Sequence, residues 1–452
     1  MRYGPTASTR TRKETVLAHC LVTGATGYVG GRLTPLLTAA GHDVRVLARS
    51  PQKLSGVPWR DDVEVARGDL SDLESLRNAF AGVDVLYYLV HSMGTATDFA
   101  DSEREAAANV AEVARESGVQ RIVYLGGLHP NDARLSPHLA SRTLVGETLM
   151  ASGVDTVVLQ AGVVVGSGSA SFEMIRHLTD RLPVMTTPKW VHNRIQPIAV
   201  RDILYYLVES ASARFPQSRA WDVGGPDVLR YGDMMQTYAE VAGLRRRRMV
   251  VLPWLTPAIA SWWVGLVTPI PSGLARPLVE SLHCDAICGE HDIDAVIPPP
   301  PGGLTPYRDA VALALACQMR ADIATTWSGE PADPLPSDPD WSGAPVRVAG
   351  STTTTRPGGA DPATALRRVA DDAGWGRRGW HVVPDSAEGT RTMTKRDRLG
   401  QTWLELTAES DAAVVHRSVR RARGLLGQVH AATVWPVRRL LLHRRVARLL
   451  SG

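Results

Sequence analysis

Two residues with chemically useful side chains, His138 and Arg142, stand four positions apart in the stretch LSPHLASR. Ser136 and Pro137 are typical of a helix start, so the spacing predicts that both side chains share one helix face. A guanidinium can hold ribose hydroxyls or a phosphate. Its permanent charge should keep the histidine neutral near pH 7, as a hydrogen-bond donor and a poor proton source. The alternative is that the serine and proline only start the helix, with the histidine on its surface.

A glycine-rich turn, LVTGATGYVGGRL at residues 21–33, is the second informative stretch. It follows a short apolar run and leads into a helical pattern, which is the context of a dinucleotide-binding turn. The first glycine should permit the tight turn, the second should admit a pyrophosphate, and the third should let the helix lie against the sheet. An ordinary strand-to-helix turn is the plainer alternative. The predicted cofactor contacts here are Gly24, Thr26, Gly27, Tyr28, Val29 and Gly30.

The residues after the second predicted strand, DVRVLA, indicate which dinucleotide is bound. Arg49 and Ser50 stand where an acid that binds the ribose 2′-hydroxyl would be expected. A guanidinium at this point suits a 2′-phosphate instead, through a forked, charged hydrogen bond. The sequence therefore favours NADP(H) over NAD(H).

Further cofactor contacts are expected where the third and fourth predicted strands end. Asp69 of GDLSD could meet the adenine edge or cap the following helix, and Leu70 is next to it. Val90 and His91 follow the fourth strand, where the ribose or nicotinamide would lie, although His91 could instead cap a helix.

These residues need a scaffold, and the hydrophobic pattern predicts one. Short apolar runs alternate with helical stretches up to about residue 158, as in a doubly wound parallel Rossmann sheet of the α/β class. The pattern then loosens into a region expected to cap the carboxyl ends of the strands. The predicted division is a Rossmann domain with its cap at 16–325 (cap mainly 160–325), a linker at 326–345 and a small α+β domain at 346–452.

Charge and cysteine content limit the function classes. The formal net charge is +4, yet residues 412–452 carry nine arginines and no acidic residue, so the rest of the chain is net acidic. A nucleic-acid-binding body is therefore not expected. The tail could meet an acidic partner or lipid, but on a helical wheel its arginines do not gather on one side. Few cysteines and a polar amino terminus favour a cytoplasmic protein.

An uncharged run at 250–274 contains Trp254, Trp262 and Trp263 and is interrupted by prolines. The longest uninterrupted helix it allows is about 12 residues, too short to cross a bilayer. We expect a wall or lid of a cleft for a small apolar ligand, with weak membrane-surface contact as the alternative.

The segment HCDAICGEH, residues 283–291, contains two histidines and two cysteines. If it is helical, Cys284, Cys288 and His291 could share a face. Four ligands from one short helix cannot readily surround a tetrahedral zinc ion, so no metal site is expected.

Read in order, the stretches TGATGYVG, ARGDLSD, YYLVHSMG, YLGGLHP, LSPHLASR, GSGSASFEMIR and RIQPIAVRDI resemble those of NmrA-like atypical short-chain dehydrogenase/reductases, from about residue 18 to 290. The resemblance implies NAD(P) binding. Catalytic members of the wider family carry Tyr-x-x-x-Lys on the helix after the fifth strand and a serine at the strand end. His138-x-x-x-Arg142 resembles that pair in spacing and position, and Gly126 and Gly127 stand where the serine would be sought.

The C-terminal stretches WSGAPVRV and RTMTKRDRLGQTWLEL resemble pieces of a polyketide-cyclase or lipid-transfer-like domain, shortened at about 350–390. Together these features predict an NADP(H)-binding oxidoreductase of an apolar small molecule. The alternative is a catalytically silent dinucleotide sensor or assembly protein of the NmrA-like type, with an unidentified protein partner.

Overall fold

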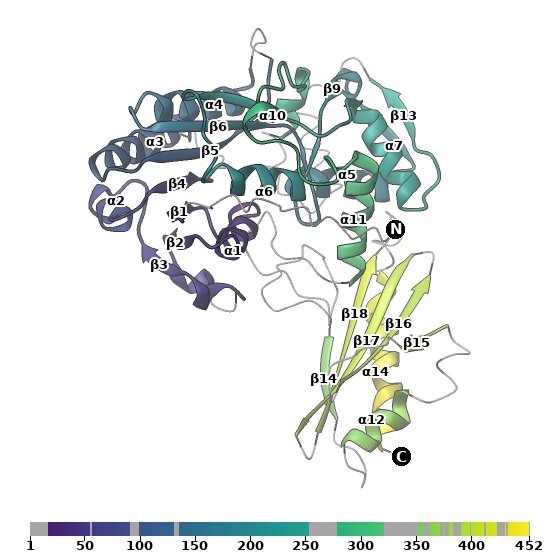
Figure 1. Ribbon diagram of the computed structural model, residues 1–452. Coiled ribbons are helices and arrows are strands. Elements are labelled where there is room, and N and C mark those ends of the chain that lie inside the picture. Colours follow the sequence, from purple (N-terminus) through teal and green to yellow (C-terminus); the bar gives the residue numbers. More distant parts are fainter. Residues whose placement is uncertain are drawn as a thin grey trace, which may run out of the picture.

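The computed structural model describes residues 17–54, 57–90, 99–130, 135–252 and 278–320, and in the C-terminal region 351–355, 362–370, 375, 379–382, 390–397, 399–410, 413–422, 430 and 433–451. A seven-stranded sheet organises the first part (Figure 1). Its strands, in spatial order, are β11 (Arg219–Val223), β6 (Asp155–Ala161), β5 (Arg121–Gly127), β4 (Val85–Tyr88), β1 (His19–Thr23), β2 (Asp43–Ala48) and β3 (Glu64–Arg67). Every neighbouring pair is parallel.

Helices cover both faces of this sheet, which is why its strands are apolar on both sides. On β1, Cys20 and Val22 belong to one buried cluster and Leu21 to another. The first cluster includes residues of α1 (Gly30–Ala39) and α6 (Val200–Glu209). The second includes residues of α2 (Leu73–Phe80), α3 (Phe99–Glu116) and α4 (Pro137–Met150). The predicted doubly wound α/β sheet is confirmed.

The strand order reverses at β1. The chain proceeds from β1 to β2 and β3 on one side, then crosses back to place β4 on the other side of β1. Open parallel sheets bind ligands beyond the carboxyl ends of their strands at such a switch point. The glycine-rich turn follows β1 directly, so the sequence places it there.

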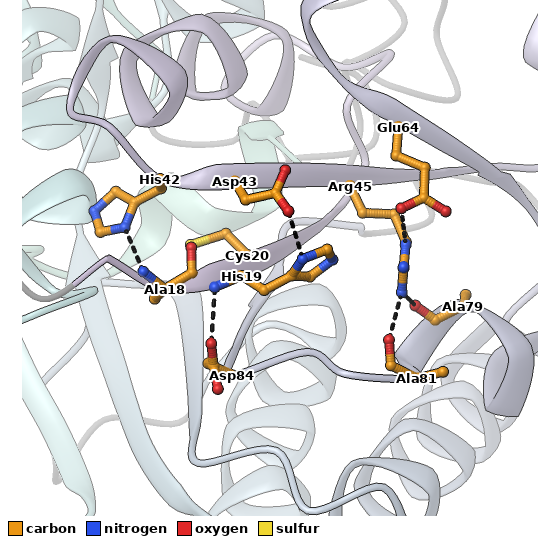
Figure 2. Close-up of polar contacts among 10 residues, drawn as sticks. All are labelled: Ala18, His19, Cys20, His42, Asp43, Arg45, Glu64, Ala79, Ala81 and Asp84. Carbon is orange, nitrogen blue, oxygen red and sulfur yellow. Dashed lines mark hydrogen bonds and ion pairs between the residues drawn. The ribbon is translucent and has the colours of Figure 1, made fainter.

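The opposite, amino-terminal edge of the sheet is held by polar contacts (Figure 2). The His19 amide donates to Asp84 at 2.8 Å, and the His19 ring lies 2.9 Å from the Asp43 carboxylate. Arg45 bonds Glu64 and, through its Nη1, donates to the Ala79 and Ala81 carbonyls at 2.8 Å each. These contacts tie β1, β2 and β3 to the carboxyl end of α2 and to the residue before β4, away from the expected binding edge.

A second group of elements forms the expected cap. It contains short paired strands, β10 (Ile198–Ala199) with β7 (Val164–Val165), β12 (Leu229–Arg230) with β9 (Arg194–Ile195), and β13 (Arg248–Val251) with β8 (Val184–Thr187). Its helices include α5 (Ala170–Arg181), α7 (Tyr231–Val241) and α11 (Tyr307–Arg320). The cap has its own core around Phe172, Met234 and Tyr238.

Three elements inside the range expected for the cap, 160–325, belong to the Rossmann layers instead. β11 extends the parallel sheet beside β6, α6 packs with α1 on one face, and Ile293 of the short α10 (Ile293–Val296) belongs to the same buried cluster as α6. The short runs of this region look alike in sequence, and only the three-dimensional pairing separates a sheet strand from a cap strand.

The C-terminal region contains an antiparallel sheet in the order β14 (Ser351–Thr355), β18 (Ala413–Ala422), β17 (Gly400–Ser410), β16 (Thr390–Asp397) and β15 (His381–Val382). It shares a core with α12 (Pro362–Ala370) and α14 (Trp435–Ser451), built around Leu366, Val369, Leu404, Leu406, Val446 and Leu450. The expected small α+β unit is confirmed as a fold class, while its likeness to a cyclase remains a hypothesis.

Two predictions lie largely outside the described residues: the linker at 326–345, and the apolar run after residue 252 with its three tryptophans. Within the part of the chain that the structure describes, no helix combines the length and apolar character needed to cross a membrane.

Candidate functional site

Backbone crowding dictates the glycines of the turn. Gly24 adopts a left-handed conformation (φ +77°), and a Cβ there would lie 2.7 Å from the Leu89 carbonyl oxygen at the end of β4. A Cβ at Gly30 would lie 2.3 Å from the Gly24 carbonyl oxygen. Gly30 is thus required because the helix begins directly against the turn. The expectation that this glycine fits the helix onto the sheet is thereby made more specific, since the close contact is with the residue that directly follows β1.

The turn leads directly into α1. The Gly27 amide donates to the Gly24 carbonyl at 2.9 Å, and the Gly31 amide donates to Gly27 at 3.0 Å. No acidic residue stands in the first turn of α1, so no carboxylate there would repel a phosphate bound at the positive end of the helix dipole. Thr26 is exposed beside it. A helix start without a carboxylate is compatible with a pyrophosphate, and the binding of one at this turn stays a prediction.

The turn is fastened to the cap through Tyr28 and Arg32. The Arg32 guanidinium lies 4.3 Å from the centre of the Tyr28 ring and donates to the Ser167 carbonyl at 2.9 Å. The Tyr28 hydroxyl fills the space in front of Gly166, where a Cβ would be 2.3 Å away. Tyr28 was predicted from the sequence as a cofactor contact, whereas this side-chain role was not predicted; its only signal was the first glycine of the GSGSAS stretch.

Arg49 and Asp69 lie close enough beyond β2 and β3 to influence each other. Arg49 is exposed, and its charge contributes to lowering the pKa of Asp69. The larger cause of that lowered pKa is a pair of hydrogen bonds from Ser71, whose amide and hydroxyl donate to the carboxylate at 3.0 and 2.8 Å. Asp72, rather than Asp69, caps α2 by accepting from the Glu74 and Ser75 amides. The helix-capping alternative for Asp69 is therefore wrong.

Two further predicted contacts flank the switch point. The Leu70 carbonyl accepts from the Asn109 side chain of α3 at 3.0 Å. Val90 follows β4, next to Leu89, whose backbone closely approaches the glycine turn. His91 lies outside the described residues. The turn, Asp69, Leu70 and Val90 thus all follow β1, β3 or β4, at the carboxyl edge of the sheet.

Helix α4 begins as predicted. Pro137 occupies its first turn, and the Ser136 hydroxyl accepts from the Leu139 amide at 3.2 Å. His138 is only 8% exposed, so the alternative of a histidine on the helix surface is wrong. Burial, and then the Arg142 charge, lower the pKa of His138 to about 4. The side chain is neutral near pH 7, as the sequence predicted.

Arg142 is anchored to the neighbouring strand. One of its terminal nitrogens donates to the Leu125 carbonyl at 2.5 Å, and the Tyr124 hydroxyl donates to the Arg142 carbonyl at 3.1 Å. The predicted pair is therefore brought together on α4, with the guanidinium held against β5. Its contact with a ribose stays a prediction.

Gly127 ends β5 where a catalytic serine was sought. A Cβ there would lie 2.7 Å from the Leu139 side chain, so α4 packs too closely for a larger residue unless Leu139 moves. Gly126 has only ordinary contacts, the nearest at 3.4 Å to Val158. The structure thus gives a packing reason for the glycine at 127 and none at 126.

A groove of about 320 Å³ lies between α4 and the β5–β6–β11 part of the sheet. Its polar groups include Arg142, Thr143, His129 and Gln160, and the His129 ring is 3.0 Å from the Thr143 hydroxyl. Glycines at 126 and 146 leave the space open. Sequence analysis did not single out His129, although it lies in the YLGGLHP stretch.

The segment 283–291 is not a helix. A short 3-10 turn ends at His283, and Ala286 then forms a bridge with Ile195. The Cys288 amide donates to Gln196, and burial, followed by Asp222 and Glu290, raises the pKa of its thiol to about 12. Among the described residues, no three side chains of the metal-ligating types gather at one point.

Comparison with known proteins supports a dinucleotide site. Residues 24–172 match a family described as NAD(P)H-binding. The chain is 32% identical over 314 residues to the 3 beta-hydroxysteroid dehydrogenase/Delta 5-->4-isomerase of Mycobacterium tuberculosis, covering 60% of this chain and 83% of that protein. It is 28% identical over 276 residues to the ceramide reductase of Caulobacter vibrioides, covering 58% of this chain and 84% of the relative.

Solved structures share the fold. The triphenylmethane reductase of Citrobacter, complexed with NADP(H), superposes with a TM-score of 0.51 at 21% identity, covering 66% of this chain and 99% of that chain. An NADPH-dependent quinone oxidoreductase of Escherichia coli, complexed with NADPH, gives 0.52 at 20% identity, covering 65% and 98%.

Proposed function

Because this chain belongs to the family of NAD(P)H-binding Rossmann dehydrogenases and reductases that includes the mycobacterial 3 beta-hydroxysteroid dehydrogenase/isomerase, we propose that it is an NADP(H)-dependent oxidoreductase of an apolar small molecule. The observation that carries the proposal is the glycine turn at the switch point. Side chains at Gly24 or Gly30 would collide with backbone, so this turn requires glycine at both positions, as a dinucleotide-binding turn does.

The residues that would hold the cofactor follow from this geometry. The turn from Gly24 to Gly30 would bind the pyrophosphate, Arg49 a 2′-phosphate, and Asp69 with Leu70 the adenine end. Val90, His91 and Arg142 would meet the nicotinamide ribose. NADPH supplies the hydride when it is bound.

The role proposed for His138 is that of a neutral hydrogen-bond donor. A neutral imidazole can polarise a carbonyl through its N–H, and a pKa near 4 keeps it neutral over the physiological range. The positive charge of Arg142 favours this state, so His138 does not act as a cationic acid. The absence of a serine at Gly127 leaves more of the polarisation to His138.

The substrate class we propose is a hydroxyl or ketone on a large apolar skeleton. The curated relatives named above are a ceramide reductase and a hydroxysteroid dehydrogenase, and another is a sterol demethylase protein of Methylococcus capsulatus. Their substrates, as named, are lipids.

We place the chain among the NmrA-like members on the motifs of its sequence. We place it in the cytoplasm on its cysteine content.

A second candidate function is dinucleotide sensing without hydride transfer. The observation that favours it is the replacement of the catalytic trio: His138 and Arg142 for the tyrosine and lysine, and Gly127 for the serine. Under this alternative, NADPH would bind and change the affinity for a protein partner.

The deciding experiment incubates the full chain with NADPH and a panel of steroid ketones, a ketone-bearing ceramide precursor and simple aldehydes. We expect NADPH oxidation with a lipid ketone, near-background rates with the simple aldehydes, and loss of oxidation in His138→Phe with NADPH binding retained. Binding of NADPH without any oxidation would favour the sensor. If the chain bound neither NADPH nor NADH, both the oxidoreductase and the sensor function would be rejected.

A further inference from the structure

Helix α14 (Trp435–Ser451) has one side that packs and one that does not. Trp435, His443, Val446 and Leu450 are buried. Val446 and Leu450 share a core cluster with Leu366 of α12. The spacing of these four residues, eight, three and four positions apart, is that of a single helix face. This face fixes which residues of α14 point to solvent.

The opposite side exposes large apolar side chains. Val437 is 61% exposed and Leu441 57%, while Leu440 is 53% and Val434, just before the helix, 41%. Val434, Val437 and Leu441 follow one another at intervals of three and four, so they form one stripe. The same stripe continues through Arg444 and Arg448, which are also exposed.

The stripe thus has an apolar half and a basic half. The arginines of the tail do not gather on one side of a helical wheel, and the structure separates those that contact the fold from those that are exposed. Arg445 lies 4.5 Å from the centre of the Trp375 ring, whereas Arg438, Arg444 and Arg448 are exposed. The exposed arginines, rather than all of them, define the surface charge.

No acidic residue balances these arginines within the last part of the chain, since 412–452 contain none. We propose that the stripe Val434–Val437–Leu441–Arg444–Arg448 docks the protein on an anionic lipid bilayer. Apolar side chains of an interfacial helix enter the boundary between headgroups and acyl chains, and arginines bind the lipid phosphates. Each arginine near an anionic surface contributes about fivefold in affinity.

Charge argues against a second copy of this chain as the occupant. A parallel pairing of two such stripes would bring two sets of arginines together, and residues 412–452 contain no carboxylate to lie between them. An anionic bilayer, by contrast, complements both halves of the stripe. The docking proposal stands on α14 alone, and the proposed lipid substrate adds a reason for such docking.

The test is cosedimentation of the full chain with vesicles of phosphatidylcholine alone or mixed with phosphatidylglycerol. We expect binding to the mixed vesicles only, weakened by salt. Arg444→Gln with Arg448→Gln should reduce the partition coefficient by about 25-fold. Val437→Ser with Leu441→Ser should also reduce it. Arg214→Gln with Arg248→Gln, two exposed arginines outside α14, changes the net charge equally and should leave much of the binding intact.

Thermal melting of each variant shows whether it is folded. NADPH titration shows whether its cofactor binding is unchanged. Equal binding of wild type and folded α14 variants would overturn the proposal, as would no binding to anionic vesicles. Self-association that Val437→Ser with Leu441→Ser abolishes, without vesicle binding, would assign the stripe to a second copy instead. The two proposals can fail separately. If wild type binds anionic vesicles but does not bind NADPH, the docking proposal is supported and the proposed function is rejected.

Discussion

Arg49 determines the predicted cofactor preference at the scale of a single residue. It is exposed beyond β2, close enough to Asp69 to lower its pKa. Replacing it in Arg49→Glu should remove a forked phosphate contact of about 1.5–3 kcal/mol, a loss of roughly 10- to 100-fold in NADPH affinity. NADH affinity should change little. Titration by nucleotide fluorescence measures both.

The control for this prediction is Arg214→Glu, an exposed arginine between α6 and β11 at the amino-terminal side of the sheet. It makes the same change in net charge without approaching the carboxyl edge. A similar loss of NADPH affinity in both variants would attribute the effect to overall charge, and an unchanged preference in Arg49→Glu would remove Arg49 from the site.

Arg142 should contribute to both stability and nucleotide binding. Arg142→Ala deletes the hydrogen bond to the Leu125 carbonyl, which should cost about 1–2 kcal/mol of unfolding free energy and weaken NADPH binding. Urea denaturation and fluorescence titration measure the two effects. Arg142→Lys retains the charge and should recover part of the binding. A destabilised variant with wild-type NADPH affinity would show that Arg142 only supports β5.

Local features were predicted from the sequence better than the distant partners of each residue. The sequence predicted the glycine turn and the helix start at Ser136, because turn chemistry and capping act locally, and it predicted the neutral state of His138 from the smaller of two causes, the Arg142 charge. It did not predict that His138 is buried or that Tyr28 reaches Gly166. Both depend on elements far away in the sequence, which no local pattern reveals.

At the scale of an element, two glycines with different surroundings make a matched pair. A Cβ at Gly30 would lie 2.3 Å from the Gly24 carbonyl, whereas a Cβ at Gly146 in α4 would have contacts of about 3.5 Å. Gly30→Ala should therefore distort the turn and abolish nucleotide binding. Gly146→Ala should stabilise α4 by about 0.5–1 kcal/mol, since alanine loses less backbone entropy in a helix. Thermal melting and NADPH titration of each variant provide the comparison. Normal NADPH binding by Gly30→Ala would mean that the backbone at Gly24 can move without loss of the cofactor site.

The strands were predicted more securely than their connections. β1 to β6 appear as apolar runs with helices between them, the pattern of a parallel sheet covered on both faces. β11 was assigned to the cap range because its short run, AWDV, resembles its cap neighbours. Its pairing with β6 follows from the crossover through α6, a relation of topology that residue types do not encode.

At the scale of the whole molecule, buried neutral histidines make stability depend on pH. In the C-terminal core, His443 lies between Ser418, at 2.7 Å, and His416, at 2.8 Å. Burial, then the neighbouring His443, lower the pKa of His416 to about 4, and burial and Arg439 lower that of His443. The unfolded chain has histidine pKa values near 6.5, so it binds these protons first as pH falls.

The stabilisation is therefore present above about pH 6.5 and is lost as pH falls towards about 4, by up to roughly 1.4 kcal/mol per pH unit for each histidine. The C-terminal unit should melt at a lower temperature near pH 5 than near pH 7, followed by the fluorescence of its buried Trp375 and Trp380. His416→Gln should flatten this dependence, while His381→Gln, at an exposed position, should not. An unchanged slope in His416→Gln would mean that other groups control the acid transition.

The fastening of the glycine turn to the cap has a consequence for how the chain can vary in length. Loops outside regular elements usually accept insertions, because few contacts depend on their course. Here Arg32 and Tyr28 span from α1 to Ser167 and Gly166, so the two loops fix each other's length. One extra residue in either loop would separate the Arg32 guanidinium and the Tyr28 ring from the Ser167 carbonyl and Gly166. Length changes in this protein should be tolerated in other surface loops long before they are tolerated in 24–32 or 166–169.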